Sequence, residues 1–190
     1  LRSVIDEDTA FIILEPIQGE SGIIVAPDGF LQEVRKLCDE KGILLIFDEI
    51  QAGLGRTGRL WAGEHWNTAP DILCLAKGIA GGVPMGATLV RPDILAAISK
   101  GEHSSTFGGN PISCAAGIAA LTSITEDGLI ENSKKMGEVF KEGLEKLKEK
   151  HTMIREIRGK GLMIGIEMKF EVKDILMGLI EEGVLMLYSG

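Results

Sequence analysis

Short apolar runs alternate with amphipathic stretches through the first half of the chain, and this alternation constrains the fold most strongly. Residues 29–41 have apolar side chains at helical spacing (Phe30, Val34, Leu37), and Gly42 follows as a helix C-cap. Such an order is typical of α/β units around a mostly parallel sheet with flanking helices. Four apolar runs have the length of buried strands: Phe11–Leu14, Ile43–Phe47, Ile72–Leu75 and Ala87–Val90.

The pattern changes beyond about residue 122. Helices are predicted from Pro92 to about Lys100 and from Pro111 to Leu121, and a long amphipathic helix follows over Asn132–Lys150. We expect residues 1–122 to form part of a large α/β domain and residues 123–190 most of a small α+β domain. The long helix has one apolar stripe, formed by Met136, Val139, Phe140, Leu144 and Leu147. Two strands, a helix and a last strand are then predicted at Met153–Arg158, Leu162–Glu167, Val172–Glu182 and Val184–Leu187.

Charge and cysteine usage narrow the function class. The net charge of -8 disfavours a nucleic-acid or anionic-membrane partner, and no apolar run approaches the length of a membrane span. The three cysteines, Cys38, Cys74 and Cys114, show no metal-ligand spacing, which favours free thiols in a cytoplasmic protein and no metal site. Because the chain starts without Met and stops at Gly190 after an apolar run, we expect a piece of a longer polypeptide.

Ionisable residues follow two of the predicted strands. One strand ends at Asp48-Glu49, and the next ends just before Lys77. Because ligands of α/β sheets bind at the carboxyl ends of the strands, this pair lies where a site is expected. Two interpretations remain open at this point. One is a salt bridge at the sheet edge, and the other is a lysine that forms a Schiff base while the aspartate holds a cofactor.

Two glycine-containing stretches have competing interpretations. Gly53–Gly58 matches G-x-G-x-x-G, but five residues separate it from the preceding strand and no helical stripe follows, which favours a tight loop over dinucleotide binding. Ser104–Pro111 runs hydroxyls and glycines into a predicted helix. It is either an anion-binding nest or an ordinary N-cap cluster. His65 and His103 have no metal-type partners nearby, which is typical of structural or surface histidines.

Taken together, these features resemble the class III, ornithine-type aminotransferases, with acetylornithine, acetyllysine and carrier-linked lysine aminotransferases the most similar members. The resemblance spans nearly the whole chain and implies the type I fold of pyridoxal-phosphate-dependent transferases. A departure is Ser104, where close relatives usually have glycine. The motifs, in family order, are Glu15–Glu20, Asp48–Gln51 with Gly53–Gly58, Ala76–Gly78 with Gly81 and Gly82, Ser105–Pro111, and Arg158–Leu162.

The resemblance implies a role for each of these residues around pyridoxal 5'-phosphate. Lys77 would hold the cofactor as a Schiff base and then shuttle the substrate proton, and Asp48 would pair with the pyridine nitrogen. Gln51 would donate a hydrogen bond to the phenolic oxygen. Ser105 and Thr106 would bind the phosphate of the neighbouring subunit's cofactor, which makes a homodimer part of the expected assembly.

Glu20 matches the position of the family's substrate gate. There a glutamate pairs with an arginine while an amino donor is bound, and releases it to bind the carboxylate of 2-oxoglutarate. The alternative is an ordinary acid on a loop surface. That arginine would follow shortly after Gly190, and several other cofactor contacts would precede Leu1. Half of the cofactor pocket is therefore expected to be missing from this chain, and by itself the chain would be inactive.

The resemblance predicts transfer of an amino group from acetylornithine, or a related N-substituted ornithine or lysine, to 2-oxoglutarate. This activity would serve arginine or lysine biosynthesis. The alternatives are an ornithine aminotransferase, a same-lineage aminomutase such as glutamate-1-semialdehyde aminomutase, and a non-catalytic interaction protein. The Gln18-Gly19-Glu20 stretch favours an aminotransferase, because a gate is needed only where two substrates alternate.

Overall fold

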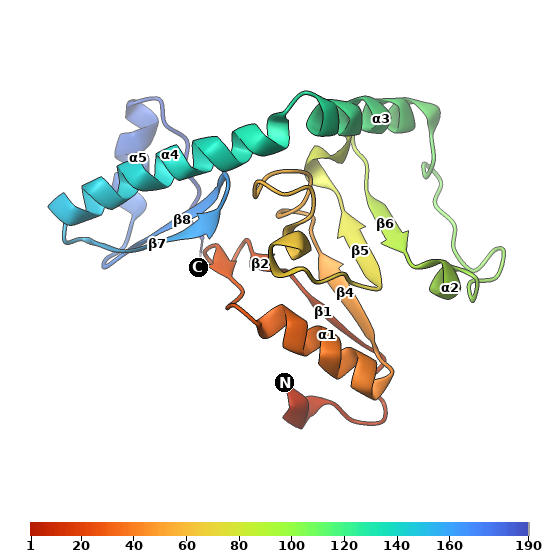
Figure 1. Ribbon diagram of the computed structural model, residues 1–190. Coiled ribbons are helices and arrows are strands. Elements are labelled where there is room, and N and C mark those ends of the chain that lie inside the picture. The colour runs from red at the N-terminus through yellow and green to blue at the C-terminus, as the bar shows by residue number, and fades with distance from the viewer. Residues whose placement is uncertain (190) are drawn as a thin grey trace.

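A computed structural model describes residues 1–189 and is built around a four-stranded sheet with the order β1-β4-β5-β6 (Figure 1). Strands β1, β4 and β5 are parallel, and β6 is antiparallel to β5. The predicted mostly parallel sheet is therefore confirmed. The strand bounds are Phe11–Leu14 for β1, Leu44–Asp48 for β4, Ile72–Leu75 for β5 and Ala87–Val90 for β6.

Helix α1 (Phe30–Lys41) packs against this sheet and connects to β4. It buries Val34 and Leu37, as predicted, together with Leu31 and Cys38, whereas Phe30, the third residue of the predicted stripe, stays 43% exposed. Gly42 caps the helix as predicted: its φ is 67°, a conformation that glycine adopts without strain.

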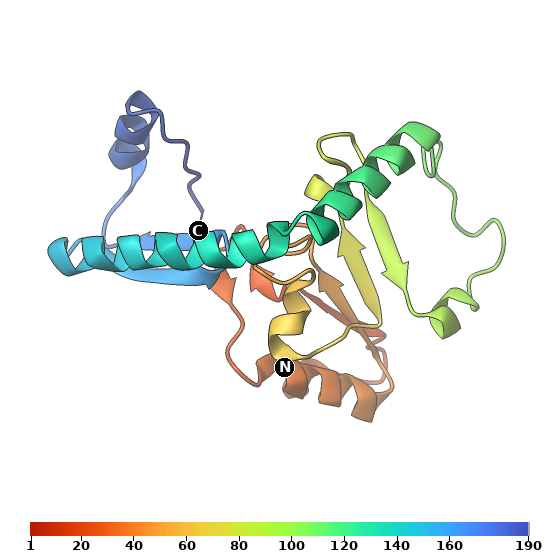
Figure 2. The ribbon, with the colours of Figure 1, turned by 45° about the horizontal axis from the view of Figure 1, so that its top comes forward.

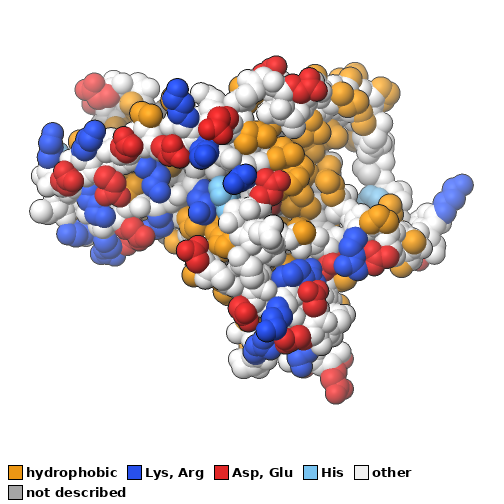
Figure 3. All heavy atoms as spheres, in the orientation of Figure 1, with side chains coloured by type: hydrophobic (Ala, Val, Ile, Leu, Met, Phe, Trp, Pro, Cys, Tyr) orange, Lys and Arg blue, Asp and Glu red, His pale blue; other side chains and the backbone are white. Residues whose placement is uncertain are grey.

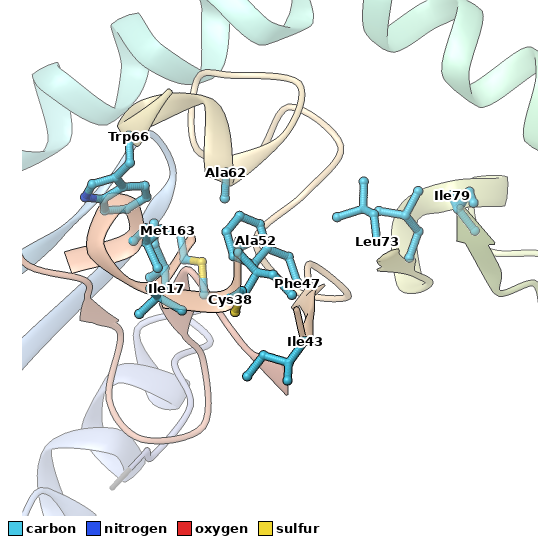
Figure 4. Close-up of a cluster of buried hydrophobic side chains, with 14 of the residues drawn as sticks. Ile17, Cys38, Ile43, Phe47, Ala52, Ala62, Trp66, Leu73, Ile79 and Met163 are labelled. Carbon is cyan, nitrogen blue, oxygen red and sulfur yellow. The ribbon is translucent and has the colours of Figure 1, made fainter. Parts of the chain in front are cut away.

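The main core lies between α1, the sheet and the short helix η2 (Ala62–Trp66), where Phe47 and Leu45 are fully buried (Figure 4). Next to it, β2 (Ile17–Gln18) and β3 (Ile24–Val25) form an antiparallel ribbon whose connecting residues carry Glu20. Two further short helices are η1 (Arg2–Val4) and η3 (Lys77–Ala80).

Two long helices run along one side of the molecule (Figures 1 and 2). Helix α3 (Pro111–Glu126) packs on η3, and α4 (Leu129–Lys150) extends away from the main sheet over the antiparallel pair of β7 (Ile154–Lys160) and β8 (Met163–Met168). Because α3 continues to Glu126, the expected division at residue 122 falls inside this helix, and the chain changes direction at Gly128, whose φ is 72°.

Two predicted elements differ in the structure, and a third is confirmed. The helix opened by Pro92 is only α2 (Pro92–Leu95), whereas the predicted last helix is present as α5 (Lys173–Glu181). The expected strand at Val184–Leu187 is wrong for the described residues, because a strand needs a hydrogen-bonded neighbour and none pairs with it there. The apolar stripe of α4 is also only partly buried: Leu144 is 8% exposed, but Phe140 is 55% exposed.

Candidate active site

Asp48 and Lys77 lie at the same edge of the main sheet. Strands β4 and β5 are parallel neighbours, with Asp48 in register with Cys74, three residues before Lys77. Within residues 1–189 no ion pair joins Asp48 to Lys77, so the interpretation as a sheet-edge salt bridge has no support in the structure. Both groups remain available at an edge where α/β proteins bind ligands.

Lys77 has an unusual backbone conformation. It is the first residue of η3 and has a φ of 50°, in the left-handed region that side chains other than glycine rarely adopt. Such a conformation costs on the order of 1 to 3 kcal/mol and tends to cluster at functional sites. The side chain is exposed at this edge, where a ligand can reach its amine.

The end of β4 and the turn that follows it carry two polar residues of the candidate site, Asp48 and Gln51. The Asp48 carboxylate accepts a hydrogen bond from the Ile50 backbone N–H at 3.0 Å, which fixes one of its oxygens. Gln51 follows in the same turn and donates a hydrogen bond through Nε2 to the carboxylate of Glu20 at 2.8 Å. The structure therefore links Glu20, through Gln51, to the turn that follows Asp48, and the neighbouring strand β5 leads to Lys77.

Glu49 supports this turn from the side of the core. Its carboxylate is 1% exposed and accepts hydrogen bonds from the backbone N–H groups of Ala62 at 2.6 Å and Gly63 at 2.8 Å. Burial raises the pKa of Glu49, although these two hydrogen bonds act in the opposite direction. Glu49 therefore ties the Asp48 turn to the start of η2. Sequence reasoning did not predict this role, although the adjacent Asp48 drew attention to the position.

The Gly53–Gly58 stretch is a run of turns, as expected, and does not open a helix. A Cβ atom on Gly58 would lie 2.8 Å from the Lys134 side chain, so its glycine allows α4 to pack closely on the loop. His65 from η2 binds the same loop: its Nε2 lies 3.1 Å from the carbonyl and the hydroxyl oxygens of Thr57. Both features are structural within the described chain.

Ser105 and Thr106 lie apart from the other predicted residues. They are exposed in the segment between α2 and α3, and no hydrogen bond of residues 1–189 joins them to Asp48, Gln51 or Lys77. The helix cap is formed instead by Asn110, whose side chain accepts a hydrogen bond from the Ser113 N–H at 2.9 Å. The N-cap interpretation of the Ser104–Pro111 stretch is therefore confirmed at Asn110, and Ser105 and Thr106 take no part in the cap.

Arg158 is a second residue whose role the sequence analysis did not predict. It opens the Arg158–Leu162 motif and reaches from β7 to the Glu20 loop, where its Nε donates a hydrogen bond to the Gly22 carbonyl at 2.7 Å.

Across residues 1–189, no cluster of three or more potential metal ligands occurs, and no helix is long and apolar enough to cross a membrane. The thiols of Cys38, Cys74 and Cys114 are all free.

Comparison with known proteins identifies the family. Residues 1–190 match the family described as aminotransferase class-III. The chain is 48% identical to an acetylornithine aminotransferase of Caldanaerobacter subterraneus subsp. tengcongensis, over 97% of this chain and 47% of that protein. It is 49% identical to an acetylornithine aminotransferase of Methanocaldococcus jannaschii, over 97% of this chain and 46% of that protein.

Among solved structures, an ornithine aminotransferase from Plasmodium yoelii superposes with a TM-score of 0.90 at 41% identity, covering 95% of this chain and 49% of that one. This likeness confirms the expected type I fold of pyridoxal-phosphate-dependent transferases. The chain spans about half the length of the curated relatives it matches. The family expectation is confirmed: the chain belongs to the class III aminotransferases.

Proposed function

We propose that this chain is the lysine-bearing half of an aminotransferase subunit that transfers an amino group from acetylornithine, or a related N-substituted ornithine or lysine, to 2-oxoglutarate. One observation supports the proposal above all. In a member of the class III family, Asp48 and Lys77 follow neighbouring parallel strands at the ligand-binding edge of the sheet, and Gln51, in the turn after Asp48, binds Glu20. In the arrangement we propose, residues 1–122 belong to the cofactor-binding domain and residues 123–190 to the small one.

The residues at the sheet edge fit pyridoxal phosphate. Asp48 is the carboxylate for the protonated ring nitrogen, and its other contact, the Ile50 N–H, orients it. Gln51 supplies an amide for the ring's phenolic oxygen, and Lys77 has no competing ion pair in the described chain. When bound, the cofactor supplies an electron sink for the substrate carbanion. Lys77 holds it covalently and, once released, carries the proton to and from the substrate.

We further propose that the protein is a homodimer. Ser105 and Thr106 are exposed in the segment between α2 and α3, and their hydroxyls are of a kind suited to a phosphate. The adjoining helix α3 leaves Ile112 77% and Ile118 68% exposed, which is typical of a helix that a partner covers. In this arrangement Ser105 and Thr106 bind the phosphate of the neighbouring subunit's cofactor.

Glu20 is the proposed substrate gate. Its exposed carboxylate accepts a hydrogen bond from Gln51, the residue that would bind the phenolic oxygen of the cofactor. A carboxylate there can neutralise a substrate-binding cation while the donor is present and withdraw when the dicarboxylate acceptor enters.

We also propose a cytoplasmic location, which is supported by the three free thiols.

An ornithine aminotransferase is the second candidate, and the likeness to the Plasmodium yoelii enzyme supports it. A same-lineage aminomutase is less well supported, because it would not need Glu20 to alternate two substrates. Turnover assays with acetylornithine, ornithine, acetyllysine and glutamate-1-semialdehyde separate these candidates. Transfer to 2-oxoglutarate from acetylornithine or acetyllysine is expected. Turnover of glutamate-1-semialdehyde alone would replace the proposal.

The central assignment is tested with Lys77→Ala in the full-length protein that carries this sequence. Cofactor added to the unsubstituted protein should produce the visible absorption band of a lysine-bound aldehyde, and Lys77→Ala should remove both the band and the activity. Lys36→Ala, an exposed lysine on α1, is the matched control and should leave both unchanged. A band that persists in Lys77→Ala would disprove the assignment.

A further inference from the structure

The loop that carries Glu20 is held through its backbone on several sides. The Gly19 N–H donates to the Glu15 carboxylate at 2.9 Å, at the end of β1. On the other side, Arg158 Nε donates to the Gly22 carbonyl at 2.7 Å, and the Ser189 hydroxyl lies 2.8 Å from the Glu20 carbonyl. These contacts come from three different parts of the chain, so the loop backbone has little freedom to shift.

The side chain of Glu20, by contrast, is exposed and has a single hydrogen-bond partner in the described chain, the Gln51 amide at 2.8 Å. That amide lies directly over the preceding residue: a Cβ atom on Gly19 would be 2.4 Å from Gln51 Oε1. The glycine at position 19 therefore leaves the space through which Gln51 reaches Glu20. The backbone is fixed, and only the carboxylate can change partners, by rotating its side chain.

Arg158 is itself well oriented for its contact with the loop. Its side chain is 16% exposed, and its guanidinium also pairs with Glu156 and Glu167 of the same two-stranded sheet. The planar guanidinium can bind these carboxylates and the Gly22 carbonyl at the same time, which the single ammonium of a lysine cannot do in this geometry. The β7–β8 pair thus positions the Glu20 loop from outside the main sheet.

We propose that Arg158 is a positioning residue for Glu20, and that Gln51 is the partner that holds the Glu20 carboxylate when it leaves a substrate-binding cation. The inference rests on the proposed function, in which Glu20 alternates between the two substrates. While the acceptor is bound, Gln51 donates a hydrogen bond to the Glu20 carboxylate. This bond replaces the lost contact with the cation, because a carboxylate without a hydrogen-bond partner in a closed site is unfavourable. Arg158 keeps the loop where this exchange needs only side-chain rotation.

The first test compares Arg158→Lys with Arg155→Lys in the full-length enzyme loaded with cofactor. Arg155 is the matched control, because it lies on the same strand and pairs with the same Glu167 but does not contact the loop. The donor and acceptor half-reactions are measured separately. Arg158→Lys should raise the KM for 2-oxoglutarate by about tenfold and the donor KM by less than about twofold. Arg155→Lys should change neither value.

A second variant keeps the inference testable if Arg158→Lys does not fold. Gly19→Ala places a methyl group against the flexible end of Gln51, which can move aside without disturbing the fold and then no longer reaches Glu20. The KM for 2-oxoglutarate should again rise more than the donor KM. In a Glu20→Gln background, Arg158→Lys should have no further effect on the ratio of the two KM values.

The outcomes separate this inference from the proposed function. If the unsubstituted enzyme transfers amino groups but Arg158→Lys changes both KM values equally or not at all, the inference is wrong and the proposed function stands. An additive effect of Arg158→Lys on Glu20→Gln would also overturn it. Absence of transfer to 2-oxoglutarate by the unsubstituted enzyme would instead overturn the proposed function.

Discussion

The core between the main sheet and α1 and the stripe on α4 differ in how completely they bury their apolar side chains. Phe47, Leu45 and Leu31 are fully buried between the sheet and α1, together with η2 residues. In the α4 region, Val139 is 57% and Phe140 55% exposed, and the α4 stripe lines an open apolar groove of about 450 Å³.

Figure 3 shows how exposed charged and hydrophobic side chains divide on one face of the molecule. Lys, Arg, Asp and Glu side chains cover the visible part of the α4 region, whereas hydrophobic side chains gather over α3 and the area beside it. The difference teaches that the Lys77 edge rests on a core that the sheet forms with α1 and η2, although Phe11, Ile13 and Leu89 of the same sheet stay about half exposed. The groove on α4 and the exposed side of α3 are surfaces whose apolar residues still face water.

The largest expected effect comes from truncating the same residue type in the two regions. Phe47→Ala should lower the free energy of unfolding of the 190-residue chain by about 3 to 5 kcal/mol, because it leaves a cavity in a fully buried position. Phe140→Ala, already half exposed, should cost less than about 1 kcal/mol. Urea unfolding measures both. Equal losses would show that the α4 region is as well packed as the sheet.

A smaller loss of stability is expected on replacing Asp71, whose carboxylate binds both a backbone N–H of β4 and two arginine side chains. Its carboxylate accepts hydrogen bonds from the Leu45 N–H at 2.7 Å, from Arg35 at 2.8 Å and from Arg91 at 2.6 Å. Burial raises the pKa of Asp71, but these hydrogen bonds outweigh it, so the pKa lies below its ordinary value.

Asp71→Asn should therefore lower the free energy of unfolding by about 2 to 3 kcal/mol at pH 7. A lowered carboxyl pKa contributes stability above the unfolded-state value of about 4, and this contribution is lost as the pH falls through the folded-state pKa. The difference between the two proteins should therefore shrink in acid. Asp93→Asn is the control: Asp93 also pairs with Arg91 but is 62% exposed, and it should have little effect. A difference that stays constant down to pH 2 would contradict this account of Asp71.

The smallest effects on the free energy of unfolding are expected from alanine substitutions of two glycines on different sides of α4, Gly137 and Gly143. A Cβ atom on Gly137 would lie 2.1 Å from the Gly161 carbonyl oxygen, whereas one on Gly143 meets nothing within 4 Å. Gly137→Ala should cost about 1 to 3 kcal/mol by pushing α4 off the β7–β8 turn. Gly143→Ala should stabilise the helix by up to about 1 kcal/mol. Thermal unfolding of the two variants should shift in opposite directions. If both are stabilising, α4 does not pack on that turn.

The elements with a strong local signal were predictable. The strands of the main sheet and the end of α1 at Gly42 follow from apolar runs and one glycine with a left-handed φ. The burial of Leu31 in place of Phe30 was not predictable. Helical periodicity shows which residues share a face of α1, but not which of two neighbouring residues at the edge of that face contacts the sheet. The strand expected at Val184–Leu187 failed for a related reason: strand formation depends on a neighbour, not only on apolar sequence.

The sequence by itself determined the family, the positions of Lys77 and Asp48 at strand ends, and the identity of Glu20 and Gln51 as candidates. Short motifs and the order of strands carry this information locally. Only the tertiary structure showed that Gln51 binds Glu20, that Glu49 holds the Asp48 turn, and that Arg158 reaches Gly22 from 136 positions away in the chain. In each contact a side chain of one segment binds a side chain or backbone group of another, and these contacts exist only once the segments have packed.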